Sequence, residues 1–182
     1  MKKVFFLVVA FCLVASSAMA AMPGGKMGFG FRLSDTPLSL IMRFNEKVGG
    51  VFGIGFSSID LGDETGTNFA LSAGLPITVI PTEKANLNVM PLIRYTSYDV
   101  RTSGGLGSSA QDGDPDFTGS MIDIALLLEV EAFISENFSV SAAHGFGISM
   151  DSPPGEGVDS STNLSTLGNN WTGFGFTFYL PQ

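Results

Sequence analysis

Cysteine, histidine and charged residues are scarce in this chain of 182 residues. Its one cysteine is Cys12, so a disulfide within the chain is excluded, and its one histidine is His144. Only 14% of the residues are charged and 45% are hydrophobic, a composition too apolar for a disordered chain. Long hydrophobic runs are also missing beyond residue 20, because no stretch there approaches the roughly 18 apolar residues of a membrane helix.

The first twenty residues carry the features of a secretory signal peptide. Lys2-Lys3 gives a positive start, residues 4–15 are apolar but too short to span a bilayer, and Ala18-Met19-Ala20 is a small-x-small cleavage site. We therefore expect residues 1–20 to be removed during export. Residues 21–182, about 160 in number, are then expected to form one domain.

The charge that remains is mainly acidic. Once Lys2 and Lys3 leave with the signal, seven basic and seventeen acidic side chains are left, a net charge of −10. We expect no nucleic-acid partner, because nucleic-acid binding requires clustered basic residues.

Glycine is plentiful, and its placement is the most informative pattern. Gly-apolar-Gly-apolar occurs four times, at residues 28–31, 53–56, 145–148 and 173–176. Side chains on a β-strand alternate between two faces, so each copy has one bulky apolar face and one face without side chains. A soluble sheet would place polar groups opposite its core, whereas a wall between lipid and a narrow lumen matches this arrangement.

Alternation of apolar with polar or small residues extends over eight segments. From the second segment onward, short connections alternate with long ones, as in outer-membrane barrels, and no helical period appears. The sequence thus predicts an all-β, eight-stranded antiparallel up-and-down transmembrane β-barrel. Pro76 and Pro91 predict an irregular patch, because proline cannot donate to the ladder. The expected strands are residues 26–33, 38–44, 48–57, 68–80, 87–100, 121–133, 138–149 and 172–180.

The inward face of these segments carries three basic and three acidic side chains, whereas the outward face carries no formal charge. Buried charges are costly unless they are paired, and an eight-stranded barrel is just wide enough for side chains to fill. We therefore expect a lumen plugged by salt bridges; the alternative is a gated polar pathway for small solutes. The six residues are Arg32, Arg43, Arg94, Asp123, Glu129 and Glu131.

His144 is the one polar residue in the middle of an outward face. A histidine can act as general base to a serine. Small outer-membrane lipid A deacylases have a serine two positions after a lipid-facing histidine, but here Phe146 takes that place. We therefore assign no catalytic residues. The remaining interpretations of His144 are a neutral interfacial side chain or a local bulge that turns it inward.

Three aspartates in a long connection resemble the start of a calcium loop. They are Asp112, Asp114 and Asp116 in the sequence Asp-Gly-Asp-Pro-Asp. An EF-hand requires glycine at the sixth position and glutamate at the twelfth, where this chain has Phe117 and Asp123. We therefore treat the segment as a solvated acidic loop and assign no metal or cofactor. A cation site, or divalent bridging to lipopolysaccharide phosphates, is the alternative.

Together, the strand count, the loop asymmetry, the Arg/Glu lumen and the last strand Phe174-Phe176-Phe178 resemble the small outer-membrane barrels of the OmpA/OmpX type. The resemblance covers about residues 26–180 and leaves no residues for a peptidoglycan-binding domain. It implies an outer-membrane location, contact with membrane lipid and lipopolysaccharide, insertion by the outer-membrane assembly machinery and a monomeric state. The chain departs from the family at its end, where Leu180-Pro181-Gln182 follows the terminal aromatics.

These observations favour a structural or surface-interaction barrel with acidic extracellular loops. One alternative is a narrow channel for small or apolar solutes. A further alternative is a lipid A-modifying outer-membrane enzyme, which would make use of His144.

Overall fold

The computed structural model describes residues 25–60, 65–99, 118–153, 160–165 and 172–181. The predicted signal peptide lies outside these residues and stays a prediction. Within the described residues no helix is long and apolar enough to cross a membrane. The strands are β1 (Lys26–Arg32), β2 (Leu38–Arg43), β3 (Gly49–Asp60), β4 (Thr65–Gly74), β5 (Ile77–Pro81), β6 (Ala85–Asp99), β7 (Thr118–Ser135), β8 (Phe138–Ser152), β9 (Ser161–Ser165) and β10 (Gly173–Tyr179).

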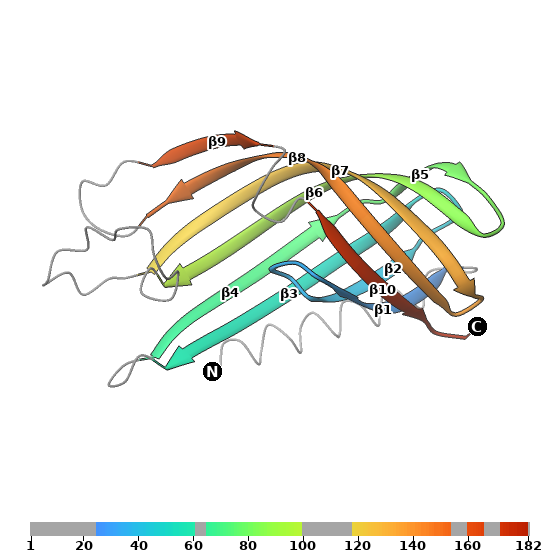
Figure 1. Ribbon diagram of the computed structural model, residues 1–182, viewed down its shortest axis with the longest axis horizontal. Helices are drawn as coiled ribbons and strands as arrows, with labels where there is room; N and C mark the ends of the chain where they lie inside the picture. The colour runs from blue at the N-terminus through green and yellow to red at the C-terminus, as the bar shows by residue number, and fades with distance from the viewer. Residues whose placement is uncertain (1–24, 61–64, 100–117, 154–159, 166–171, 182) are drawn as a thin grey trace, which may run out of the picture.

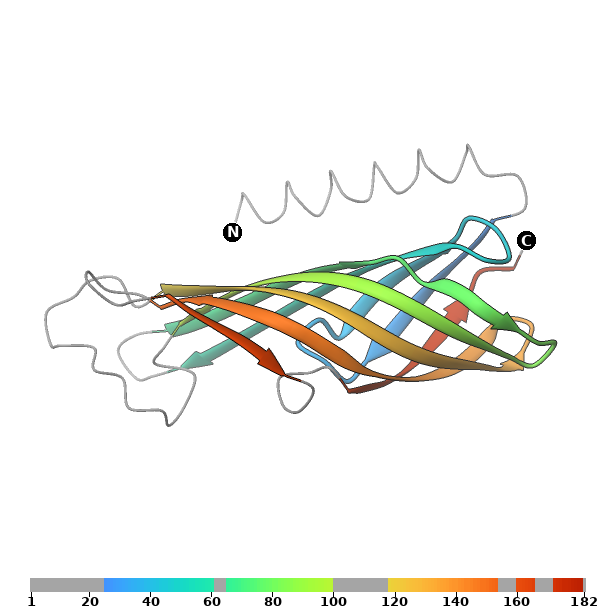
Figure 2. The same cartoon turned by 90° about the horizontal axis from the view of Figure 1, so that it is seen from above.

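The strands form one antiparallel sheet that closes on itself. Its order is β10-β1-β2-β3-β4-β6-β7-β8-β9, and β10 also pairs with β8, which completes the ring (Figures 1 and 2). β5 prolongs the wall beside β6, and β9 is added to the far part of β8. The prediction of an all-β, eight-stranded antiparallel barrel is therefore confirmed.

The register of the strands sets their tilt. We followed the paired residues from strand to strand once round the barrel, starting at Val140 in β8. The path returns to β8 at Met150, ten residues further along the strand. For eight strands about 4.8 Å apart with a rise of about 3.4 Å per residue, this shift gives a tilt of about 40° from the barrel axis.

Alternation divides the side chains between the two faces of the wall. Large apolar side chains point outward and are exposed on both short and long strands; Phe29, Phe56 and Leu128 are 58%, 69% and 52% exposed. Buried polar and charged side chains point inward, together with a small apolar cluster around Met90 and Leu127. The core of a soluble protein is thus replaced by a mainly polar interior behind an apolar outer surface.

The predicted single strand over residues 68–80 is wrong, because it is divided into β4 and β5. Pro76 is fully buried at the break and has no N–H to give to the ladder. Leu75 instead donates its N–H to the carbonyl oxygen of Pro91 at 3.0 Å, and the β5–β6 register shifts between Thr78 and Ile80. The predicted irregular patch at the two prolines is thus confirmed.

The wall is much lower on one side than on the other. β10, β1 and β2, which we call the low wall, have 7, 7 and 6 residues, whereas β6, β7 and β8 have 15, 18 and 15. Figure 1 shows the low wall confined to one part of a barrel that the long strands span completely.

The strand that pairs with β8 changes where the low wall ends, and we call this place the fork of the wall. β8 pairs with β10 through residues 138–143 and with β9 through residues 147–151, so the change occurs near His144. In both views β9 lies in the left half of the barrel and β10 in the right half (Figures 1 and 2). β9 was not expected from the sequence, because its five residues have no apolar alternation and form a strand only by pairing with the free edge of β8.

Candidate functional site

The barrel interior brings together all six charged residues that the sequence places there. Each arginine lies beside a carboxylate of β7, and the three carboxylate side chains are at most 5% exposed. We call these six residues the interior network. Its ion pairs are Arg32–Glu129 at 2.7 Å, Arg43–Glu131, and Arg94–Asp123 at 2.7 Å.

Neutral side chains complete the hydrogen bonds of the buried carboxylates. Glu131 accepts from the hydroxyls of Ser139 at 2.8 Å and Tyr179 at 2.6 Å. Glu129 accepts from the amide of Asn88 at 3.1 Å. A buried carboxylate is tolerated when both a cation and further donors surround it, so these partners make the interior network a stable arrangement.

A fourth carboxylate reaches the interior from the connection between β1 and β2. Asp35 Oδ2 lies 2.9 Å from Nη1 of Arg94, and Thr36 Oγ1 lies 2.9 Å from the hydroxyl of Ser72. The β1–β2 connection, residues 34–37, is therefore folded into the barrel rather than away from it. Asp35 was not among the interior charges predicted from the sequence.

The glycines of β3 make room for this inward connection. A Cβ atom at Gly55 would collide with the main-chain carbonyl oxygen of Asp35, and a Cβ at Gly53 would lie 2.8 Å from Thr36 Oγ1. The signal available in the sequence was therefore the Gly-x-Gly pair of β3, since glycine permits such a close backbone approach.

The other glycine pairs also face inward, as predicted. A Cβ at Gly30 or Gly175 would meet inward-facing side chains of neighbouring strands. Tyr98 lies against Gly119 of the adjacent strand β7, and its hydroxyl donates to Asp151 at 2.5 Å.

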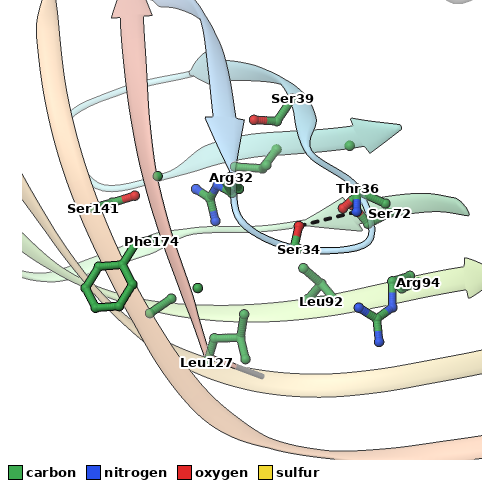
Figure 3. A pocket seen from close by; sticks show the side chains of 15 residues that line it. Arg32, Ser34, Thr36, Ser39, Ser72, Leu92, Arg94, Leu127, Ser141 and Phe174 are labelled. Atoms are coloured by element: carbon green, nitrogen blue, oxygen red, sulfur yellow. Dashed lines mark hydrogen bonds between the residues drawn. The ribbon is translucent and has the colours of Figure 1, made fainter. Parts of the chain in front are cut away.

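A cavity of about 50 Å³ lies inside the barrel at the upper rim of the low wall (Figure 3). The inward connection borders it through Ser34 and Thr36, and the ends of the low-wall strands border it through Arg32 and Phe174. The volume corresponds to only a few water molecules. The apolar part of its lining includes Val51, Leu92, Leu127, Ala143 and Phe174.

Two buried hydroxyls have no hydrogen-bond partner among the described residues. They belong to Ser39, which is 6% exposed, and to Thr96. Ser39 lines the cavity, whereas Thr96 is not among the residues that border it. Because a buried hydroxyl without a partner costs free energy, the Ser39 hydroxyl marks a place where the cavity can accept a hydrogen-bonding group.

His144 lies on the outward face of β8 and is exposed, so the bulge that would turn it inward is not found. Its Nδ1 atom is 2.6 Å from the hydroxyl of Thr172, just before β10. Phe146, two residues further along the same strand, offers no hydroxyl to His144. Thr172 could not be predicted as its partner, because this residue is remote in the chain and becomes adjacent only after barrel closure.

The three aspartates of the candidate cation loop, Asp112, Asp114 and Asp116, lie outside the described residues. Elsewhere, in the part of the chain that the structure covers, no group of three or more His, Cys, Asp or Glu residues could hold a metal ion.

Comparisons with protein-family models, curated proteins and solved structures found no match to this chain.

Proposed function

We propose that this protein is an integral outer-membrane β-barrel with a plugged lumen and a structural or surface-interaction role. The observation that carries this proposal is the reversed distribution of side chains, with exposed apolar groups outside and buried ion pairs inside. Such a continuous apolar surface is unfavourable in water and favourable in a hydrocarbon layer. Membrane lipid and lipopolysaccharide are then the surroundings of a monomer that the outer-membrane assembly machinery inserts.

The height of the apolar surface supports this proposal. Outward side chains of β7 are apolar from Ile122 to Ile134, a distance of about 30 Å along the axis at the rise and tilt of this barrel. This matches the thickness of a bilayer core. Above it, hydroxyls follow on the same face, including Ser97, Ser120 and Ser152, which are paired across β6, β7 and β8.

The location has a direct test. Separation of inner and outer membranes should place the protein in the outer-membrane fraction, and unboiled samples should migrate differently from boiled samples on a denaturing gel. A folded barrel resists detergent until it is heated, whereas an unfolded chain shows one mobility. Recovery in the soluble periplasmic fraction, with no mobility shift, would overturn the proposal.

The plugged lumen is supported by the interior network, the inward β1–β2 connection and the small cavity. The alternative function is a narrow channel. Planar-bilayer recordings of the purified barrel should therefore show no discrete conductance steps. Regular steps that scale with salt concentration would contradict the plug and favour the channel.

A second candidate function, a lipid-modifying enzyme, draws on the His144–Thr172 hydrogen bond. An imidazole can take the proton of the adjacent hydroxyl, whose oxygen then attacks an acyl ester to form an acyl-enzyme ester while the protonated imidazole gives its proton to the leaving alcohol. Water, activated by the same imidazole, hydrolyses the acyl-enzyme ester and releases the fatty acid. If the role is structural, His144→Ala and Thr172→Val should both leave the acylation pattern of lipid A unchanged in mass spectra. Loss of a deacylated species in both variants, with normal barrel assembly, would establish the enzyme instead.

A further inference from the structure

We propose that the cavity at the rim of the low wall binds the carboxylate head of a long-chain fatty acid, whose hydrocarbon chain lies on the outer surface of the barrel. The inference rests on the proposed membrane location, because the chain would be surrounded by lipid.

The cavity lies next to the outer surface at the end of β10. Phe174 borders the cavity and is also 62% exposed on the outward face. Gly173 and Ala143, which are paired between β10 and β8, border it as well. Immediately beyond this pair β8 leaves β10 and continues with β9, so the cavity lies at the fork of the wall.

The polar lining of the cavity is suited to a carboxylate. Arg32 borders it, together with the hydroxyls of Ser39 and Ser141. Arg94 borders it as well, but its nitrogens already contact Asp123 and Asp35, so Arg32 is the cation that would meet the ligand. Arg32 contacts Glu129 through Nη2, and a guanidinium has five N–H donors in all. The hydroxyl of Ser39 supplies a further donor, for which the described part of the chain offers no partner.

The size of the cavity decides what kind of molecule fits. A cavity of about 50 Å³, the space of only a few water molecules, accommodates a carboxylate. The apolar lining from Val51, Leu92 and Leu127 suits the first carbon atoms of a hydrocarbon chain. The remainder of a long chain must therefore lie outside the cavity.

The outer surface next to the cavity has a row of aromatic side chains on which the hydrocarbon chain of the fatty acid can lie. Phe174, Phe176 and Phe178 alternate down β10, and Phe31 of β1 stacks on Phe176 with ring centres 5.6 Å apart. Phe138 of β8 packs against the same row, 4.8 Å from Phe178. Phe174 at the cavity edge is the next outward side chain of β10 after Phe176, so the head and the hydrocarbon chain of one molecule can be accommodated together.

The test is binding of tritiated palmitate to the purified full barrel in detergent, with acetate as competitor. Wild type should bind palmitate saturably at one site, and millimolar acetate should compete poorly because it lacks the chain. Ser39→Ala should weaken palmitate binding about tenfold, since a hydrogen bond to a charged group is lost. Thr96→Val is the matched control, because it removes the other buried unpartnered hydroxyl without touching the cavity.

Equal palmitate affinity in Ser39→Ala and wild type would overturn the site. Competition by acetate as strong as by unlabelled palmitate would show a small-anion site and would overturn the lipid assignment. Heat-dependent gel mobility and membrane fractionation of the same samples report the proposed function separately. A barrel that fractionates normally but binds no palmitate would therefore refute only this inference.

Discussion

Replacing Arg94 by methionine should destabilise the folded barrel by about 3–5 kcal/mol. Arg94 is 3% exposed and contacts Asp123, which is fully buried, through both Nε and Nη2. Its Nη1 also holds Asp35 of the inward connection. Methionine fills most of the volume but leaves the Asp123 carboxylate buried without its cation. Such an unpaired buried charge is among the most costly single changes in a folded protein.

Urea unfolding of the barrel in lipid vesicles, followed by the gel-mobility shift, measures this loss. Lys84→Met is the matched control, because Lys84 is exposed in a turn, and it should change the free energy of unfolding by less than about 0.5 kcal/mol. Adding Asp123→Asn to Arg94→Met should recover more than half of the loss, since the buried charge is then removed. An Arg94→Met variant as stable as the control would show that the pair contributes little.

Gly55→Ala should release the inward β1–β2 connection from the lumen. The added methyl group would occupy the position of the Asp35 carbonyl oxygen, which is backbone and cannot rotate away. Overpacking of this kind costs about 1–3 kcal/mol, and displacement of the connection relieves it. This cost corresponds to an increase of about 5- to 150-fold in the population with the connection outside.

Cysteine labelling can measure this release, because the chain beyond Cys12 contains no cysteine. In a Thr36→Cys background the thiol is expected to be protected from maleimide, since Thr36 is 7% exposed. Adding Gly55→Ala should raise the rate of maleimide labelling by the same factor as the population with the connection outside, about 5- to 150-fold. Gly173→Ala is the control, because the nearest atom to its Cβ is 3.6 Å away, an ordinary contact. Equal rates with both alanines would contradict the steric role of Gly55.

The barrel class could be predicted from the sequence because strand geometry is local. Side chains on a strand alternate with a period of two, so a segment such as residues 121–133 reveals which of its residues share a face without any knowledge of its neighbours. A shift of one residue in the register of a strand would exchange its apolar face with its charged face. The same rule placed Arg94 and Asp123 on the inner face, and both lie there.

The candidate site could be predicted only in part. The alternation identified the charged residues of the interior network. It could not identify which arginine pairs with which carboxylate, because each of the three arginines could pair with any of the three carboxylates. Asp35 was missed because it lies in a connection, where alternation carries no information. Thr172 was missed because its contact with His144 depends on the closure of β10 against β8.

The sequence by itself determined the number of barrel strands, the apolar outer face and the inward position of the paired glycines, since each follows from local periodicity and side-chain size. Only the tertiary structure decided the partners within the interior network, the inward course of residues 34–37, the low wall and the cavity at its rim. These features depend on the ten-residue shift at which the sheet closes. That shift is set by contacts between strands that are far apart in the chain, and no short stretch of sequence records it.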